Sequence, residues 1–112
     1  MAEAYKLHTG LVASVSAGSG TALYTVPADT TAIVSSIYVA NRETDTDHTI
    51  NIEVNDAGSR RFLVKGVAVP MQSTFQPLNK SLVLETGDIL EFSADAAGAN
   101  DLDASISVLE IT

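Results

Sequence analysis

One short stretch of the chain brings together side chains that are able to bind a metal ion. Residues 44–48, "TDTDH", place Asp45, Asp47 and His48 close to one another. Oxygen ligands at such spacing can share one cation, as they do in calcium sites, but the stretch lacks the glycine and the distal glutamate of an EF-hand loop. Acidic loop tips are usually only solvated. We therefore expect no metal here, and the same reasoning applies to a looser acidic cluster, Asp95, Asp101 and Asp103.

Residue types used in catalysis are present, but they do not form a catalytic pattern. The chain has no cysteine and two histidines, His8 and His48, and neither lies in a nucleophile motif. Glu85 and Asp88 are spaced like paired carboxylates, but they flank a predicted turn, where charge is expected for solubility. We therefore expect a protein that is not an enzyme and that needs no cofactor.

The charge balance argues against nucleic acid and membrane as partners. The chain has 14 acidic and 6 basic side chains and a net charge of -8, and such a surface repels phosphate backbones and anionic lipids. The basic residues at positions 60, 61 and 65 are interrupted by apolar ones, which favours a solvated strand edge. The first residues, "MAEAYKLHTG", lack the apolar run of a secretion signal, and no stretch approaches the roughly 20 apolar residues of a membrane span. We expect a product made in the cytoplasm.

Strands must position these side chains, because helix patterns are almost absent. Short runs of Val, Ile, Thr and Ser are separated by turn residues. We expect strands over 5–11, 23–26, 30–41 and 102–112, a hairpin over 48–66, an edge segment between Pro70 and Pro77, and a second hairpin over 80–95. A chain of 112 residues holds one core. The expected fold is all-β, a two-sheet antiparallel sandwich, jelly-roll-like, of about eight short strands.

The strand over 30–41 is apolar on both faces and therefore needs cover on both sides. Regular alternation assigns its apolar side chains to two faces: Ile33, Ile37 and Val39 on one, and Val34, Tyr38 and Ala40 on the other. Further apolar residues lie in the N-terminal stretch and on the last strand. They are the candidates for contact with another copy or another protein: Tyr5, Leu7, Leu11, Val12, Leu109 and Ile111. We infer a self-associating protein with strand or arm exchange; the alternative is that both faces are simply internal.

Three segments together resemble the small virion structural proteins of tailed bacteriophages. They are "TALYTVPADTTAIVSSIYVAN" at 21–41, "LVLETGDILEFSA" at 82–94 and the closing "ISVLEIT" at 106–112. In that family a "LYTVPA" strand and corner, a strand ending in Asn, a "LxLxxGD" hairpin and a final strand ending near "xxE" recur on β-sandwich or jelly-roll domains. The resemblance covers residues 21–112, so residues 1–20 would form an N-terminal arm or first strands, and 21–112 the sandwich.

The resemblance implies a structural part of the phage particle and no catalytic residues. The stand-alone length is similar to that of an oligomeric capsid decoration, or cement, protein, which stabilises the head. Its implied partners are further copies of itself, with a homotrimer favoured, and the major capsid protein or other virion proteins. The implied location is the virion, after synthesis in the host cytoplasm.

A tail, neck or fibre-associated protein is the alternative, and it could act as a receptor- or carbohydrate-binding module. Such modules usually present exposed aromatic side chains for stacking on sugars. Most of the few aromatic residues of this chain lie at core-like positions: Tyr5, Tyr24, Tyr38, Phe62, Phe75 and Phe92. That distribution favours the decoration protein.

Overall fold

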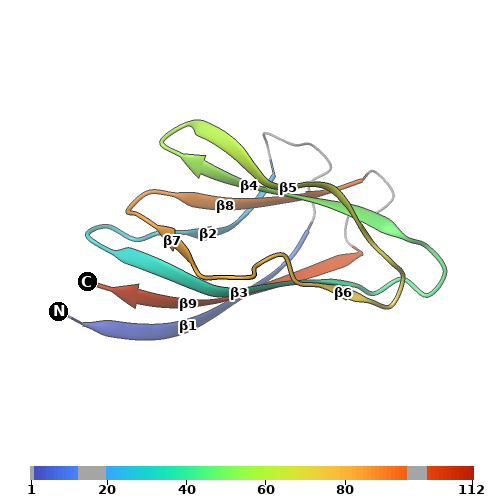
Figure 1. Ribbon diagram of the computed structural model, residues 1–112, viewed down its shortest axis with the longest axis horizontal. Coiled ribbons are helices and arrows are strands. Elements are labelled where there is room, and N and C mark those ends of the chain that lie inside the picture. Colours follow the sequence, from blue (N-terminus) through green and yellow to red (C-terminus); the bar gives the residue numbers. More distant parts are fainter. Residues whose placement is uncertain (1, 13–19, 96–100) are drawn as a thin grey trace.

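The computed structural model describes residues 2–12, 20–95 and 101–112, and every regular element among them is a strand. The strands are β1 (Glu3–Leu11), β2 (Thr21–Thr25), β3 (Thr31–Asn41), β4 (His48–Asp56), β5 (Ser59–Val69), β6 (Thr74–Phe75), β7 (Leu82–Leu84), β8 (Ile89–Ala94) and β9 (Leu102–Ile111). They form two antiparallel sheets that pack face to face (Figure 1). The predicted two-sheet sandwich is confirmed. No helix in the described part of the chain is able to span a membrane.

The strand order is that of a jelly roll. Sheet A has the order β1-β9-β3-β6, with β7 also paired to β3, and sheet B has the order β2-β8-β4-β5. The chain crosses between the sheets at every connection except β4–β5 and β6–β7. Because β6 and β7 pair with the same strand, they act as one interrupted strand, and each sheet then has four positions.

One predicted hairpin is confirmed and the other is wrong. β4 and β5 pair along their whole length around the turn at Ala57 and Gly58. Strands β7 and β8 do not pair with each other, because β7 joins β3 in sheet A and β8 joins sheet B. The turn residue Gly87 has a φ of 88°, which suits glycine. Its N–H donates to the carbonyl of Val26 at 3.1 Å, so this turn forms a corner between the sheets.

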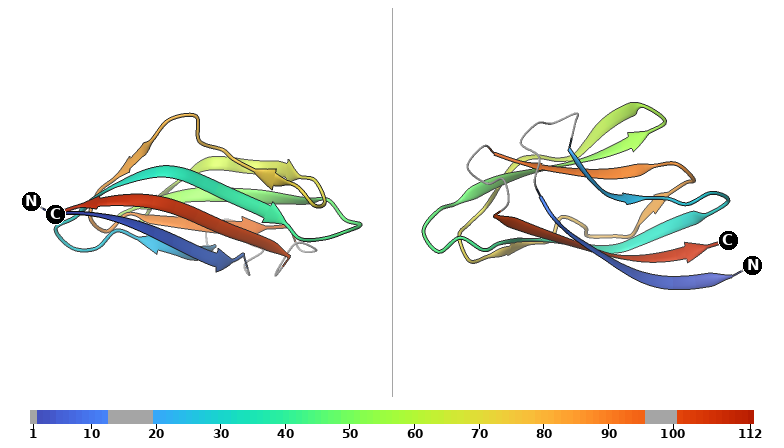
Figure 2. Two further views of the ribbon diagram at one scale, coloured as in Figure 1. Left: turned by 90° about the horizontal axis from the view of Figure 1, so that it is seen from below. Right: turned by 180° about the vertical axis from the view of Figure 1, so that it is seen from behind.

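The N-terminal segment is a strand of the sandwich rather than a separate arm. β1 pairs with β9 without a register shift, from Glu3 opposite Ile111 to Leu11 opposite Asp103. The termini meet, since the Ala2 N–H donates to the Thr112 carbonyl at 3.1 Å and the Thr112 N–H donates back at 2.9 Å. Figure 2 shows β1 beside β9 in both views. Residues 3–11 are therefore part of sheet A; residues 1 and 13–19 lie outside the described residues.

The core lies between the sheets, and a bulge changes which side chains of β3 reach it. The pairing of β3 with β9 shifts register between Val34 and Ser36, which inserts one extra residue and reverses the alternation. Val34, Ile37 and Val39 are therefore buried, while Ile33 lies on the outer face. The predicted grouping of Ile33 with Ile37 and of Val34 with Tyr38 is wrong for this reason.

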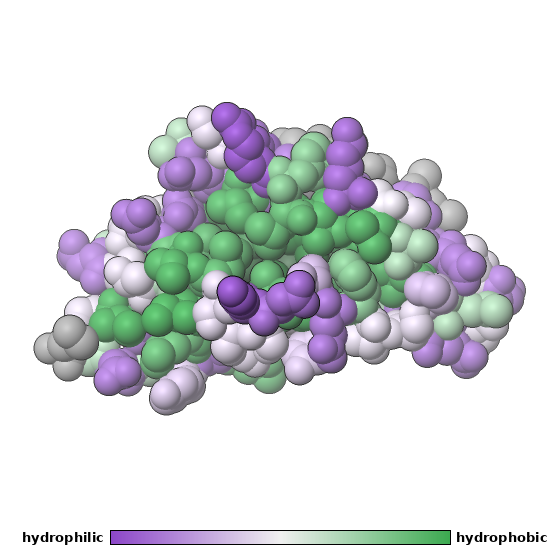
Figure 3. Space-filling view, in the orientation of Figure 1, coloured by the Kyte–Doolittle hydropathy of each residue, from purple (hydrophilic) through white to green (hydrophobic). Residues whose placement is uncertain are grey.

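Apolar side chains also remain in view where the two sheets meet beside β5, β6 and β7. Figure 3 shows them gathered in the middle of this side of the molecule. β5, β6, β7 and the β6–β7 connection carry four apolar residues that are only partly buried against the core: Val67, Phe75, Leu78 and Leu82. The short strands β6 and β7 close this side less completely than a continuous strand would.

A cross-sheet hydrogen bond fixes β1 and β9 against sheet B. The Tyr24 hydroxyl donates to Glu110 Oε2 at 2.6 Å, and Lys6 Nζ lies 3.0 Å from Glu110 Oε1. The hydrogen bond from Tyr24 holds the pKa of Glu110 below its ordinary value, although burial opposes this. Burial, and then the contact with Glu110, raises the pKa of Tyr24. The nearly buried carboxylate of Glu110 is therefore kept ionised by two partners from different strands.

Candidate functional site

An apolar row crosses the outer face of sheet A. Tyr5 of β1 lies opposite Leu109 of β9, which lies opposite Ile33 of β3, which lies opposite Val83 of β7. The two end residues of this line of four are more exposed than its two middle residues, with 83% of Tyr5 and 60% of Val83 accessible. Leu7, next to the row on β1, is 68% exposed. We call these five side chains, Tyr5, Leu7, Ile33, Val83 and Leu109, the outer apolar row.

Small and hydroxyl-bearing residues lie beside the outer apolar row and make the rest of the face shallow. One depression of about 370 Å³ is lined by Tyr5, Leu7, Ser35 and Ser107, among others. A second, of about 410 Å³, lies further along the face beside Tyr38. Both are open, so this face suits contact with another surface better than enclosure of a small molecule.

The structure sorts the predicted contact residues into three groups. Tyr5, Leu7 and Leu11 are exposed. Leu109 and Ile111 are half-buried on β9, on the same face. Val12 is 1% exposed and belongs to the core, so it is not available to a partner. The sequence pattern did not identify Ile33 and Val83 as contact candidates. The bulge in β3 moves Ile33 to the face opposite to Ile37, and Val83 lies beside Ile33 only because β7 pairs with β3.

Among the described residues, β1 has a ladder partner on one side only, so it is an edge strand. It pairs with β9 on one side and is the first strand of sheet A. An edge strand presents backbone N–H and C=O groups that another strand can pair with. The outer apolar row ends on this edge, so the face and the edge form one continuous surface.

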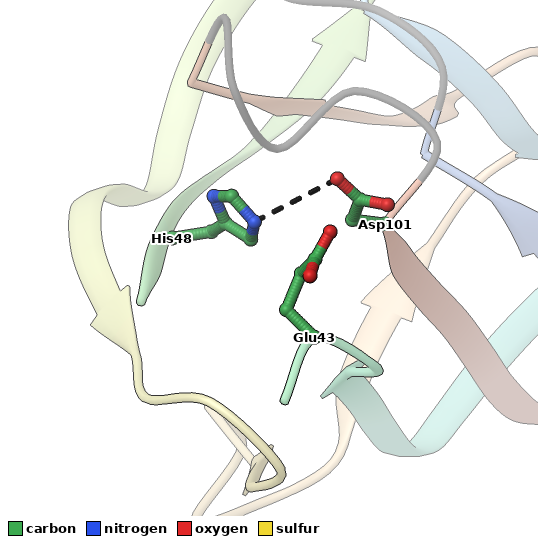
Figure 4. A group of neighbouring side chains, drawn as sticks. All are labelled: Glu43, His48 and Asp101. Atoms are coloured by element: carbon green, nitrogen blue, oxygen red, sulfur yellow. Dashed lines mark ion pairs between the residues drawn. The ribbon is translucent and has the colours of Figure 1, made fainter. Parts of the chain in front are cut away.

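A second group of side chains differs from the metal candidates that the sequence suggested. Asp47 Oδ1 accepts the Met71 N–H at 2.9 Å, and Asp45 Oδ1 accepts the hydroxyl of Thr46 at 3.0 Å. His48 is buried instead, and it meets Glu43 and Asp101, with all three ligand atoms within 4.8 Å of one another (Figure 4). We call Glu43, His48 and Asp101 the β4-end cluster.

Contacts on both sides hold the β4-end cluster in place. His48 Nδ1 lies 3.1 Å from Asp95 Oδ1. A hydrogen bond with Asp101 raises the pKa of Glu43, and the charge of Asp101 adds to this effect. Of the looser cluster predicted near the C-terminus, Asp95 and Asp101 face His48, whereas Asp103 pairs with Arg42 Nε at 2.9 Å. The chain folds these groups together from segments that are far apart in the sequence.

The two histidines occupy different environments. The His8 ring lies 4.7 Å from the Tyr24 ring, at an interplanar angle of 47°, under β1. His48 faces carboxylates at the opposite end of the sandwich from the termini. The Nε2 atom of each ring has no hydrogen-bond partner among the described residues, so no described serine hydroxyl is bonded to it. Comparison with known proteins adds no assignment, since no protein-family model, curated protein or solved structure matches the chain.

Proposed function

We propose that this chain is a self-associating structural protein whose outer apolar row contacts a second copy of the chain. The observation that carries the proposal is the row itself, which exposes Tyr5, Leu7 and Val83 on a regular sheet face. Large apolar side chains gathered on one face mark protein contact sites. The resemblance to tailed-phage virion proteins extends the proposal to a particle component, in first place an oligomeric capsid decoration protein.

The energetics favour an assembly with many copies. Covering Tyr5, Leu7 and Val83 would contribute on the order of 1.5–3 kcal/mol for each side chain. Association of two proteins costs about 4–15 kcal/mol in lost freedom of motion. One such contact is therefore weak alone, whereas a closed trimer, or an array bound to a shell, repeats it and gains from multivalency.

The charge distribution is compatible with this role. A net charge of -8 keeps free copies soluble and makes them repel one another. The outer apolar row is uncharged, so contact through it avoids the direct pairing of like charges. We expect association to strengthen as salt screens the remaining repulsion.

The alternative, a receptor- or carbohydrate-binding module of a tail or fibre, draws support from one observation. Tyr5 and Tyr38 are 83% and 39% exposed on the same face, and each lines one of its two depressions. Exposed aromatic rings beside hydroxyl groups suit stacking on sugar rings. Tyr5 therefore serves both candidate functions, and an experiment must separate them.

Light scattering on the purified chain tests self-association. We expect an oligomer at micromolar concentration, and we expect a larger oligomeric fraction at higher salt.

Mixing the chain with capsids that lack it tests the decoration role. We expect added density at regular positions on the shell and a higher shell melting temperature. A monomer that leaves capsids unchanged but binds host cells or glycans would replace the first proposal with the second.

A further inference from the structure

We propose that the β4-end cluster, Glu43, His48 and Asp101, binds one divalent transition-metal ion of the zinc class. The cluster lies at the end of the sandwich away from the termini, where the β3–β4 connection meets the start of β9 (Figure 1). The proposal does not depend on self-association, because none of the three side chains belongs to the outer apolar row.

The orientation of His48 is the first step of the argument. Its Nδ1 lies 3.1 Å from Asp95 Oδ1, while Asp95 Oδ2 accepts the backbone N–H of Thr49 at 3.1 Å. A carboxylate fixed in this way favours the imidazole tautomer that carries its proton on Nδ1 and a lone pair on Nε2. Histidines that bind metal through one ring nitrogen usually donate the other N–H to a carboxylate or carbonyl.

The second step is the lack of a hydrogen-bond partner for the other ring nitrogen. His48 is 2% exposed, and its Nε2 atom is buried without a hydrogen-bond partner among the described residues. The Asp101 Oδ2 atom is 3.8 Å away, which is too long for a hydrogen bond. A buried nitrogen lone pair that faces carboxylate oxygens is unfavourable, because neither group can donate a hydrogen bond to the other. A cation between them would interact favourably with the lone pair and with the carboxylates.

The third step is the position of the two carboxylates. Glu43 and Asp101 point into the same space as His48 (Figure 4), and all the ligand atoms lie within 4.8 Å of one another. Zinc binds nitrogen and oxygen ligands at about 2.0–2.2 Å, so a small rotation of the partly exposed Glu43 side chain brings the three around one ion. Glu43 and Asp101 are only partly buried, so an ion would enter from the side of these two carboxylates.

The ligand types select the class of metal. One imidazole with two carboxylates suits zinc, and also manganese, cobalt or nickel, whereas calcium takes 6–8 oxygen ligands and magnesium keeps several waters. The ion would join the β3–β4 connection, the first residue of β4 and the residue before β9. A metal would therefore stabilise this end of the sandwich.

The test is calorimetric titration of Zn²⁺ into the full chain after chelator treatment and chelator removal. Thermal unfolding is followed in parallel, with Ca²⁺ as the comparison ion. We expect one equivalent of Zn²⁺ to bind and to raise the melting temperature, and Ca²⁺ to have no such effect. Co²⁺ gives a second readout, since four-coordinate binding produces an intense visible spectrum.

Two matched variants of the same loop make the assignment specific. Glu43→Gln removes a proposed ligand with little change in shape and should weaken Zn²⁺ binding more than about tenfold. Asp45→Asn removes an exposed carboxylate that the cluster does not use and should leave binding unchanged. Equal losses in both variants, binding of several equivalents that Glu43→Gln leaves intact, or no binding to the wild-type chain would overturn the proposal.

Discussion

Two edge strands of the sandwich, β1 in sheet A and β5 in sheet B, are built differently. β1 pairs with its neighbour in unbroken register. The pairing of β5 with β4 shifts twice, between Ile50 and Glu53, and Gly66 beside these shifts has a φ of 62°. The Gly66 N–H donates to the side chain of Asn51 at 2.8 Å instead of to a backbone carbonyl. Bulges of this kind twist an edge and obstruct pairing with another strand.

The side chains reinforce the difference. β5 carries Arg60, Arg61 and Lys65, half of the 6 basic residues of the chain. β1 carries one, Lys6, which is paired with Glu110, while Tyr5 and Leu7 are exposed. Charged side chains and bulges on an edge strand disfavour pairing with another chain, whereas a regular edge with exposed apolar side chains favours it. The comparison therefore identifies β1 as the edge available to a partner and β5 as the protected one.

Both edges are nevertheless anchored in a similar way. Lys6 of β1 lies 3.0 Å from Glu110, and Arg60 of β5 lies 3.0 Å from Glu91. The two glutamates are each 6% exposed. The edges thus differ in what they offer to another molecule rather than in how they are attached to their own sheet.

The largest effect is expected from removing β1 altogether. Deletion of residues 1–12 takes Val12 out of the core and leaves β9 as the edge of sheet A. The lost burial of Val12 alone costs about 1.5–3 kcal/mol, and the β1–β9 ladder is lost as well. We expect a strongly lowered melting temperature by circular dichroism. An unchanged melting temperature would show that β1 is a dispensable arm after all.

The next largest effect is on self-association, and it should differ between variants of β1 and variants of β5. Tyr5→Asp combined with Leu7→Asp places charge on the β1 edge and should weaken self-association by at least about 100-fold, because two apolar contacts are lost. Phe62→Asp is the control on β5, where Phe62 is 44% exposed, and it should leave the oligomer intact. Light scattering across a dilution series measures both variants. If they behave alike, β1 is not the contact edge.

A smaller effect concerns the anchor of β1. Tyr24→Phe removes the 2.6 Å hydrogen bond to Glu110 and should lower the free energy of unfolding by about 1.5–3 kcal/mol at neutral pH, since the acceptor is charged. Tyr5→Phe, the same change on an exposed tyrosine, should cost nearly nothing. Urea unfolding measures both variants.

The stability difference between wild type and Tyr24→Phe should also depend on pH. The hydrogen bond from Tyr24 holds the pKa of folded Glu110 below its ordinary value of 4.5. The resulting stability is fully present above pH 4.5 and is lost as the pH falls through the lowered pKa. The stability difference between wild type and Tyr24→Phe should therefore shrink on acidification. A difference that stays constant down to acid pH would show that Glu110 does not respond to Tyr24.

The smallest losses of stability are expected from replacing one glycine on each edge strand by alanine. Gly66→Ala forces a side chain into a φ of 62° and should cost about 1 kcal/mol, although nothing lies near the new atom. In Gly10→Ala of β1 the new atom would come 2.6 Å from Leu23 Cδ1, the end of a flexible side chain that can rotate away. We expect a loss of less than about 0.5 kcal/mol there. The reverse order in urea unfolding would contradict the different roles assigned to the two edges.

Local patterns predict the strands of this chain better than their partners. The alternation of apolar and polar residues over 50–55 predicts that Ile50 and Ile52 lie inside, and both are buried, because the period of a strand depends on neighbouring residues alone. The Gly87 turn predicts a reversal of the chain, but not that β7 and β8 enter different sheets. The bulge before Ser36 depends on the partner strand β9, so the sequence of β3 does not reveal it.

The two candidate sites show the same limit. Tyr5 and Leu7 are recognisable from the sequence as apolar residues that could contact a partner. The outer apolar row is not recognisable from the sequence, because its members become neighbours only through the register of four strands. His48 is recognisable as a possible ligand, whereas Glu43 and Asp101 meet it only through the sheet topology.

The position of β9 also determines when the sandwich can form. Among the described strands β1 is synthesised before all others, and its one ladder partner there is β9, which is synthesised after all others. The β4–β5 hairpin, by contrast, can close as soon as residue 69 has left the ribosome. Pairing Glu3 with Ile111 brings together residues from the two ends of the chain, and contacts so distant in sequence slow folding. Sheet A is thus completed only in a late step, and until then each new chain has an apolar first strand that any nearby copy could pair with.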